Sequence, residues 1–246
     1  MVTALTLCSR ELSRFFRQRS RVAGAILPPL LFWFLIGSGL SGSFRHEGSS
    51  SYLQYFFPGT VVMIVLFAAI FSTISIIEDR REGFLQVVLV SPAPRWSIAL
   101  GKIAGGASIA FLHGAFFLLL SPWVGASWSI HGALFGAASL AGISVGLTAL
   151  GFLIAWKMDS TQAFHAVMNL FLMPMWFLSG SLFPLETSPG WLRAVMTANP
   201  LTYGVAALRE ALFGGGQAGG SLWVCLAFAV LLSLLAVVLS SKPERP

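Results

Sequence analysis

Long apolar runs constrain this sequence more than any other feature. A helix needs about 20 mostly apolar residues to cross the hydrocarbon layer of a membrane. Charged residues make up only 10% of the chain, whereas a soluble domain has about 25%. The sequence therefore predicts an all-α integral membrane protein with six transmembrane helices and no room for a soluble domain of ordinary size. The expected spans are residues 22–40, 56–77, 98–120, 134–156, 164–182 and 222–239.

The distribution of basic residues predicts the orientation of these spans. Six spans place both termini on one side, and 12 of the 15 Lys and Arg residues fall on that side. Basic residues concentrate in the cytoplasm, so we expect cytoplasmic termini and an inner (plasma) membrane location. The net charge of +6 then points to anionic lipid headgroups as partners and not to nucleic acid.

The first 21 residues are expected to form an amphipathic helix that lies in the membrane interface. Its apolar side would face the acyl chains and its arginines the lipid phosphates. The alternative is a basic tail that only sets topology. The apolar side consists of Leu5, Cys8, Leu12, Phe15 and Phe16, and the basic side of Arg10, Arg14, Arg17 and Arg21.

A charged segment follows the second span, at residues 78–82 (Glu-Asp-Arg-Arg-Glu), and continues into an apolar half-helix that ends near Pro92. Consecutive charges are costly inside hydrocarbon, so residues 78–92 are expected to lie outside it. A polar start followed by an apolar half is typical of a short helix that lies on the membrane surface and docks a soluble partner.

Residues 183–216 contain too few consecutive apolar residues to span. Pro200 after Asn199 is a helix-start signal, so we expect two short helices, at 189–197 and 201–213. By the predicted orientation this segment is external and dips back into the membrane edge, and residues 217–246 hold the last span and the tail.

The sequence offers little for catalysis or for energising transport. Gly101-Lys102 is the only Gly-Lys pair, and Trp96 and Ile103 stand where a phosphate-binding loop needs Gly and Ser or Thr. Cys8 and Cys225 lie too far apart in sequence to indicate a metal site, and no series of intramembrane carboxylates predicts a proton relay. We therefore expect no cofactor, no metal and no enzymatic activity in this chain.

Some intramembrane polar residues are candidates for lining a pathway. His113 is the only ionisable residue near the middle of a span, and Gln162, His165 and Asn169 share one face of the fifth span. Packing between helices is the competing interpretation.

Gly142-Ile143-Ser144-Val145-Gly146 matches the nucleophile-elbow pattern, and an intramembrane serine hydrolase would pair Ser144 with His113 or His165. That motif requires a strand-to-helix turn. This copy lies in an apolar helix, where Gly142 and Gly146 favour close helix packing.

Three stretches resemble the ABC-2 type transport permeases, membrane subunits of ATP-binding cassette exporters. They are I-I-E-D-R-R-E-G-F-L-Q-V-V-L-V-S-P at 76–92, L-S-G-S-L-F-P-L at 178–185 and N-P-L-T-Y-G-V-A-A-L-R-E at 199–210. The likeness covers the whole chain as one transmembrane domain and is greatest to the drug-exporter and nodulation-type branch. Phe84 and Gln86 depart from that family's usual Thr and Glu.

The resemblance implies a role for each segment. Residues 1–21 would be an elbow helix, 78–92 a coupling helix on a separate ATPase, and 183–213 re-entrant helices that close the pathway, with spans two and five lining the route. The partners would be two ATPase subunits, which hold ATP and Mg, and an identical second permease. The implied coupling residues are Glu78, Asp79, Arg80, Arg81, Glu82, Gly83, Phe84, Leu85 and Pro92, and the implied external gate is Asn199, Pro200 and Tyr203.

The expected function is ATP-driven export of an amphiphile such as a drug, a lipid-like molecule or a glycan, as in multidrug resistance. A cytochrome-biogenesis or polysaccharide export permease is the alternative within transport, and the serine hydrolase is the alternative from another class.

Overall fold

The computed structural model describes residues 2–40, 51–91, 94–126, 129–214 and 219–241, which form a helical bundle without strands in those ranges. Six of its helices are long and apolar enough to cross a membrane, which confirms the predicted fold class. They are α2 (Arg19–Leu40), α3 (Tyr52–Arg81), α5 (Arg95–Leu118), α6 (Ile130–Ala155), α7 (Thr161–Trp176) with its continuation η2 (Phe177–Ser181), and α10 (Gly219–Ser241).

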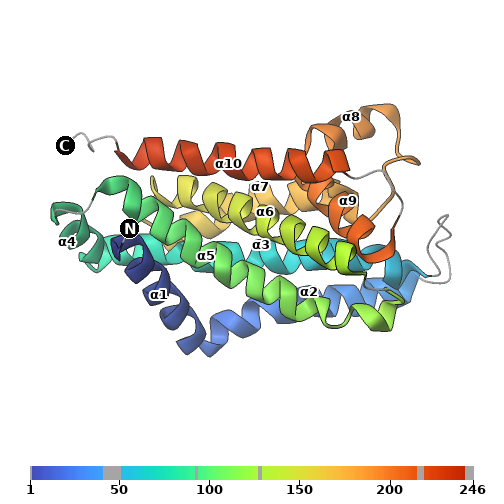
Figure 1. Ribbon diagram of the computed structural model, residues 1–246, viewed down its shortest axis with the longest axis horizontal. Coiled ribbons are helices and arrows are strands. Elements are labelled where there is room, and N and C mark those ends of the chain that lie inside the picture. Colours follow the sequence, from blue (N-terminus) through green and yellow to red (C-terminus); the bar gives the residue numbers. More distant parts are fainter. Residues whose placement is uncertain (1, 41–50, 92–93, 127–128, 215–218, 242–246) are drawn as a thin grey trace.

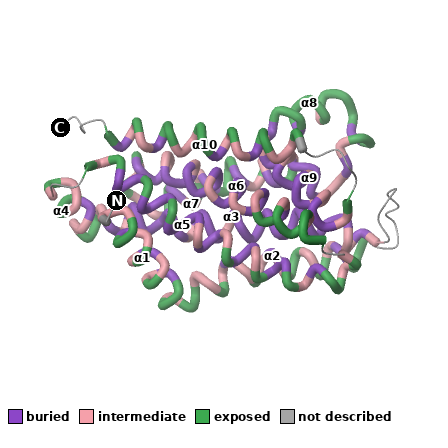
Figure 2. The backbone as a smooth tube through the Cα atoms, viewed as in Figure 1, coloured by how far each residue is buried: buried purple, intermediate pink, exposed green. Residues whose placement is uncertain are grey.

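Helix α3 lies at the centre of the bundle. It packs against α2, α5, α6 and α7, and most of its residues are buried (Figure 2). Apolar residues on every side suit a helix that neighbouring helices surround inside a bundle. Ser51 starts the helix by accepting a hydrogen bond from the backbone N–H of Gln54.

Helices α5, α6 and α10 form one face of the bundle. Glycines let α10 approach α6 closely, because a Cβ atom at Gly142 would lie 3.2 Å from Cys225 Sγ and one at Gly146 would lie 3.0 Å from a Phe228 ring carbon. The glycine pair thus serves helix packing, as small residues commonly do in membranes.

The short helices gather at the two ends of the bundle (Figure 1). At one end, called here the α4 end, lie α1 (Val2–Arg17) and α4 (Phe84–Val90). At the other end lie η1 (Ser121–Val124), α8 (Gly190–Ala198) and α9 (Pro200–Phe213). The two short helices expected at 189–197 and 201–213 are present almost as predicted.

Several boundaries differ from expectation. The N-terminal helix ends at Arg17 and α2 begins at Arg19, so one helix through residue 21 was wrong. Pro28 and Pro29 lie inside a continuous α2. The fifth span breaks at η2, where Gly180 adopts a positive φ of 73° and Asn199 Nδ2 donates to the Leu178 carbonyl (3.0 Å).

Candidate functional site: the α3–α4 corner

The charged segment does not form a helix of its own. Residues 78–81 are the last turn of α3, which continues four residues beyond the expected end of the span at Ile77. Gly83 then turns the chain with a φ of 77°, a conformation that favours glycine. Only Phe84–Val90 forms the separate helix α4, and Pro92 lies outside the described residues.

Asp79 is the centre of a buried ionic cluster. Its side chain is fully buried, and Arg10 donates to both carboxylate oxygens at 2.8 and 2.9 Å. Arg14 donates to the same carboxylate at 2.6 Å, and Lys102 of α5 forms a further ion pair with it. A buried charge is tolerated when it is paired and hydrogen-bonded, which explains how Asp79 remains inside the bundle.

The neighbouring carboxylates extend this cluster toward solvent. Arg14 also donates to Glu78 and to Glu82, each at 3.1 Å, and Arg21 pairs with Glu78. The arginines of the first 21 residues were expected to face lipid phosphates. That expectation was wrong for Arg10, Arg14 and Arg21, because all three pair with carboxylates of the α3–α4 corner.

Glu11 and Lys102 complete the cluster, and sequence reasoning missed both. Lys102 Nζ lies 2.6 Å from Glu11 Oε1, and both side chains are almost fully buried. The signal was present in the sequence, because Lys102 is a lone charge within the apolar run 98–120 and charges in such runs need a partner. The hydrogen bond from Arg10 to Asp79 is the main cause that raises the pKa of Arg10 above its ordinary value.

The remaining arginines of the segment lie on the other side of α3. Arg80 reaches the α6–α7 connection, where it donates to Asp159 (3.1 Å) and to the Met158 carbonyl (3.3 Å). Arg81 is exposed. Among the implied coupling residues, four thus bind other parts of this chain: Glu78, Asp79, Arg80 and Glu82.

Helix α4 is fixed on its inner side and open on its outer side. Leu85 is buried against the bundle, and the Phe84 ring lies under Arg10, whose guanidinium carbon is 3.8 Å from the ring centroid. Val87 and Val90 are 66% and 85% exposed. The corner therefore presents a short apolar face that is braced from behind by the ionic cluster.

The four candidate pathway residues do not come together. His113 is buried, lies 2.8 Å from the Ile109 carbonyl through Nδ1, and packs against Phe15 of α1. Gln162 and Asn169 are exposed on α7, and His165 is half-buried beside Phe71. Spans two and five, which are α3 and α7, were expected to line the route. Because α3 is buried within the protomer, only α7 offers an open face.

Two of the implied gate residues, Asn199 and Tyr203, form hydrogen bonds at the other end of the bundle. Asn199 accepts from the Leu201 N–H and donates to the carbonyls of Met175 and Leu178, so it joins α9 to the end of α7. Pro200 begins α9, and Tyr203 donates to the Thr197 carbonyl at 2.9 Å. These contacts fix the α8–α9 turn against η2.

The described residues around Ser144 do not form the nucleophile–base pair that a serine hydrolase needs. Ser144 is fully buried in α6, and its hydroxyl has no hydrogen-bond partner within the described chain, so no base activates it. No group of three or more His, Cys, Asp or Glu that could hold a metal occurs in the described ranges.

A bundle of six apolar helices with a braced surface helix at one end defines the class of protein: a multi-pass membrane protein. The family model for the ABC-2 type transporter matches residues 3–213. The chain therefore belongs to the ABC-2 type transporter family, and its role is that of a transmembrane permease subunit.

Named relatives agree with this assignment. The chain is 29% identical over 207 residues to the putative transport permease ycf38 of Cyanophora paradoxa, covering 82% of this chain and 71% of that protein. It is 27% identical over 227 residues to nodulation protein J of Sinorhizobium fredii, covering 90% and 86%. It is 24% identical over 217 residues to the daunorubicin resistance ABC transporter permease protein DrrB1 of Streptomyces coeruleorubidus, covering 85% and 75%.

Proposed function

We propose that this chain is the membrane subunit of an ATP-driven exporter and that α4 is its docking helix for a separate ATPase. The observation that carries the proposal is the outer face of α4, where Val87 and Val90 are largely exposed beside a rigid ionic cluster. An exposed apolar face beside a braced corner is the surface that a soluble partner can bind. ATP and Mg are held by that partner.

The ionic cluster connects docking at α4 with movement of α1 and α3. A displacement of α4 moves the Phe84 ring, which contacts Arg10 of α1, and Arg10 in turn pairs with Asp79 of α3. ATP binding in the partner shifts the permease between conformations only if α4 is held differently in the two states. We infer that such a difference moves the bundle between inward-open and outward-open states.

The exposed face of α7 supports a second copy of the permease. Gln162 and Asn169 face outward from a membrane-spanning helix, and polar residues in such positions face another helix or a water-filled cavity more often than lipid. We therefore propose a homodimer with two ATPase subunits, in which the α7 faces border the pathway. The inner membrane and cytoplasmic termini follow from the basic residues at the α4 end.

The cargo is proposed to be an amphiphile, namely a drug, a lipid-like molecule or a glycan. The test is co-reconstitution with candidate ATPases in vesicles, with ATP-dependent movement of a fluorescent amphiphile as the readout. Movement that requires ATP, and that Glu82→Ala uncouples from ATP hydrolysis, supports the proposal. Normal transport by Glu82→Ala, or amphiphile movement without ATP, contradicts it.

A further inference from the structure

An open apolar furrow crosses the face formed by α5 and α6. It consists of three adjoining cavities with volumes of about 480, 460 and 420 Å³. The first and second share Ala141 and Val145, and the second and third share Phe111. Along α5 the furrow begins at Trp96 and reaches Leu119, a rise of about 35 Å at 1.5 Å per residue, which matches the roughly 30 Å of bilayer hydrocarbon.

Exposed tryptophans stand at both ends of the furrow. Trp96 lines the first cavity at the α4 end and is 39% exposed, and Trp123 follows Pro122 of the third cavity and is 83% exposed. Tryptophan concentrates at the headgroup level of membranes. The furrow therefore runs between the two headgroup levels and opens to hydrocarbon between them.

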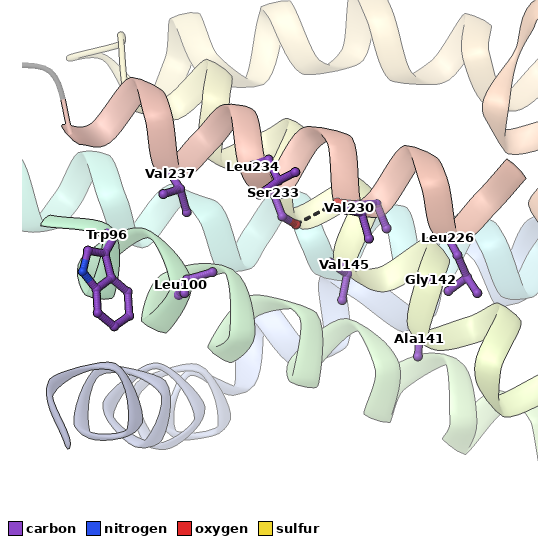
Figure 3. A pocket seen from close by; sticks show the side chains of 11 residues that line it. Trp96, Leu100, Ala141, Gly142, Val145, Leu226, Val230, Ser233, Leu234 and Val237 are labelled. Carbon is purple, nitrogen blue, oxygen red and sulfur yellow. Dashed lines mark hydrogen bonds between the residues drawn. The ribbon is translucent and has the colours of Figure 1, made fainter. Parts of the chain in front are cut away.

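The first cavity has the most uniformly apolar wall of the three. It is a groove bounded by Trp96 and Leu100 of α5, by α6, and by one side of α10 from Leu226 to Val237 (Figure 3). The Ser233 hydroxyl donates to the Ala229 carbonyl at 2.8 Å and is thereby satisfied within α10. The wall of the second cavity is less uniformly apolar, because it includes the Ser144 hydroxyl, which has no hydrogen-bond partner among the described residues.

The length and the apolar wall of this groove favour an acyl chain as its occupant. From Leu226 to Val237 the groove is about 16 Å long, and its volume is about 480 Å³. A hydrocarbon chain, whose carbon atoms contact neighbours at about 3.5–4.0 Å, fits along such a wall.

We propose that the groove between α5, α6 and α10 is a phospholipid site that holds one acyl chain, with the headgroup at Trp96. Arg95, the first residue of α5, stands beside that tryptophan and attracts a lipid phosphate. An unfilled groove would lose dispersion contacts along its wall, and the chain of a lipid at this level supplies them. This site lies away from the exposed α7 face and does not depend on the proposed cargo.

The test uses a matched pair of substitutions. Ala141→Leu places a larger side chain at a position that lines both the first and the second cavity. Ala227→Leu makes the same change at an exposed position of α10 that does not line the groove. Native mass spectrometry of the full chain, titrated with dipalmitoyl phosphatidylglycerol in detergent, measures lipid retained per protomer.

We expect wild type and Ala227→Leu to retain the lipid and Ala141→Leu to bind it about tenfold more weakly. Equal retention by all proteins, or no retention by wild type, overturns the proposal. A second measurement is independent of how Ala141→Leu folds: a photo-crosslinking residue replaces Val230, which lines the groove and is 58% exposed. Attachment to phosphatidylglycerol supports the site, and attachment to a polypeptide overturns it.

Discussion

Arg10 and Asp79 form a bidentate ion pair, with distances of 2.8 and 2.9 Å from the guanidinium nitrogens to the carboxylate oxygens, across 69 positions of sequence. The pair joins α1 to the last turn of α3. Two parallel charge-assisted hydrogen bonds fix direction as well as distance. The α3–α4 corner is therefore a braced structure and not a solvated charged loop.

Asp79→Asn should be strongly destabilising. It leaves the cations of Arg10, Arg14 and the buried Lys102 without their shared anion, and breaking a buried pair costs about 3–5 kcal/mol. Thermal unfolding in detergent should show a large fall in Tm. The matched control is Glu82→Gln, whose partner Arg14 meets a carboxylate that is 59% exposed, so the expected cost is within about 1 kcal/mol. Equal losses in the two variants would contradict a buried cluster.

Glu11 and Lys102 should behave as an energetically coupled pair. Each single substitution, Glu11→Gln or Lys102→Met, leaves the other charge buried with one partner fewer, whereas the double variant removes both charges. Residues in one ion network show coupling of about 0.5–3 kcal/mol. The double variant should therefore lose less stability than the sum of the single losses, as measured in a double-mutant cycle by Tm. Strict additivity would show that the two side chains act separately.

Arg10→Lys should impair coupling more than it impairs assembly. Lysine keeps the positive charge but loses the bidentate geometry and the planar contact with Phe84. We expect ATPase binding to persist, while ATP-dependent transport falls several-fold. Arg17→Lys, an exposed position of the same helix, is the control and should transport normally. Full transport by Arg10→Lys would argue that the contact between Arg10 and Phe84 does not couple α4 to transport.

Gly59→Ala should disturb the centre of the bundle. A Cβ atom there would lie 2.5 Å from Ser181 Cβ and 2.9 Å from its Cα, and the Gly59 carbonyl accepts a hydrogen bond from Trp176 Nε1 at 2.8 Å. Overpacking of this kind costs about 1–3 kcal/mol. Gly39→Ala, where no described atom outside its own stretch of α2 lies within 4 Å of the added carbon, should leave Tm unchanged or slightly raised. A similar Tm for both variants would contradict the close α3–η2 contact.

The spans were predictable because each depends on a local property, the length of an apolar run. The two short helices after the fifth span were predictable for a similar reason, since Asn199-Pro200 carries its own start signal. How these helices pack was harder to predict from the sequence. At the break of α7 in η2, Asn199 donates to carbonyls more than 20 residues earlier in the chain.

Only part of the site could be predicted from the sequence. The charged segment was recognised, but its charges were interpreted as a surface for a partner. The pairing of Asp79 with Arg10 and Lys102 joins three separate helices, and residue spacing along one helix carries no information on such contacts. The lone Lys102 in an apolar run and the lone Glu11 among arginines were the available signals.

The central claim is that α4 docks the ATPase, and the most direct measurement is co-purification of candidate ATPase subunits with two matched variants. Val90→Asp places a charge on the outer face of α4, where the side chain is 85% exposed. Val195→Asp makes the same change on α8, at the opposite end of the bundle, where it is 47% exposed. We predict that wild type and Val195→Asp retain the ATPase and that Val90→Asp loses it while keeping its Tm. Full ATPase retention by Val90→Asp would contradict the account.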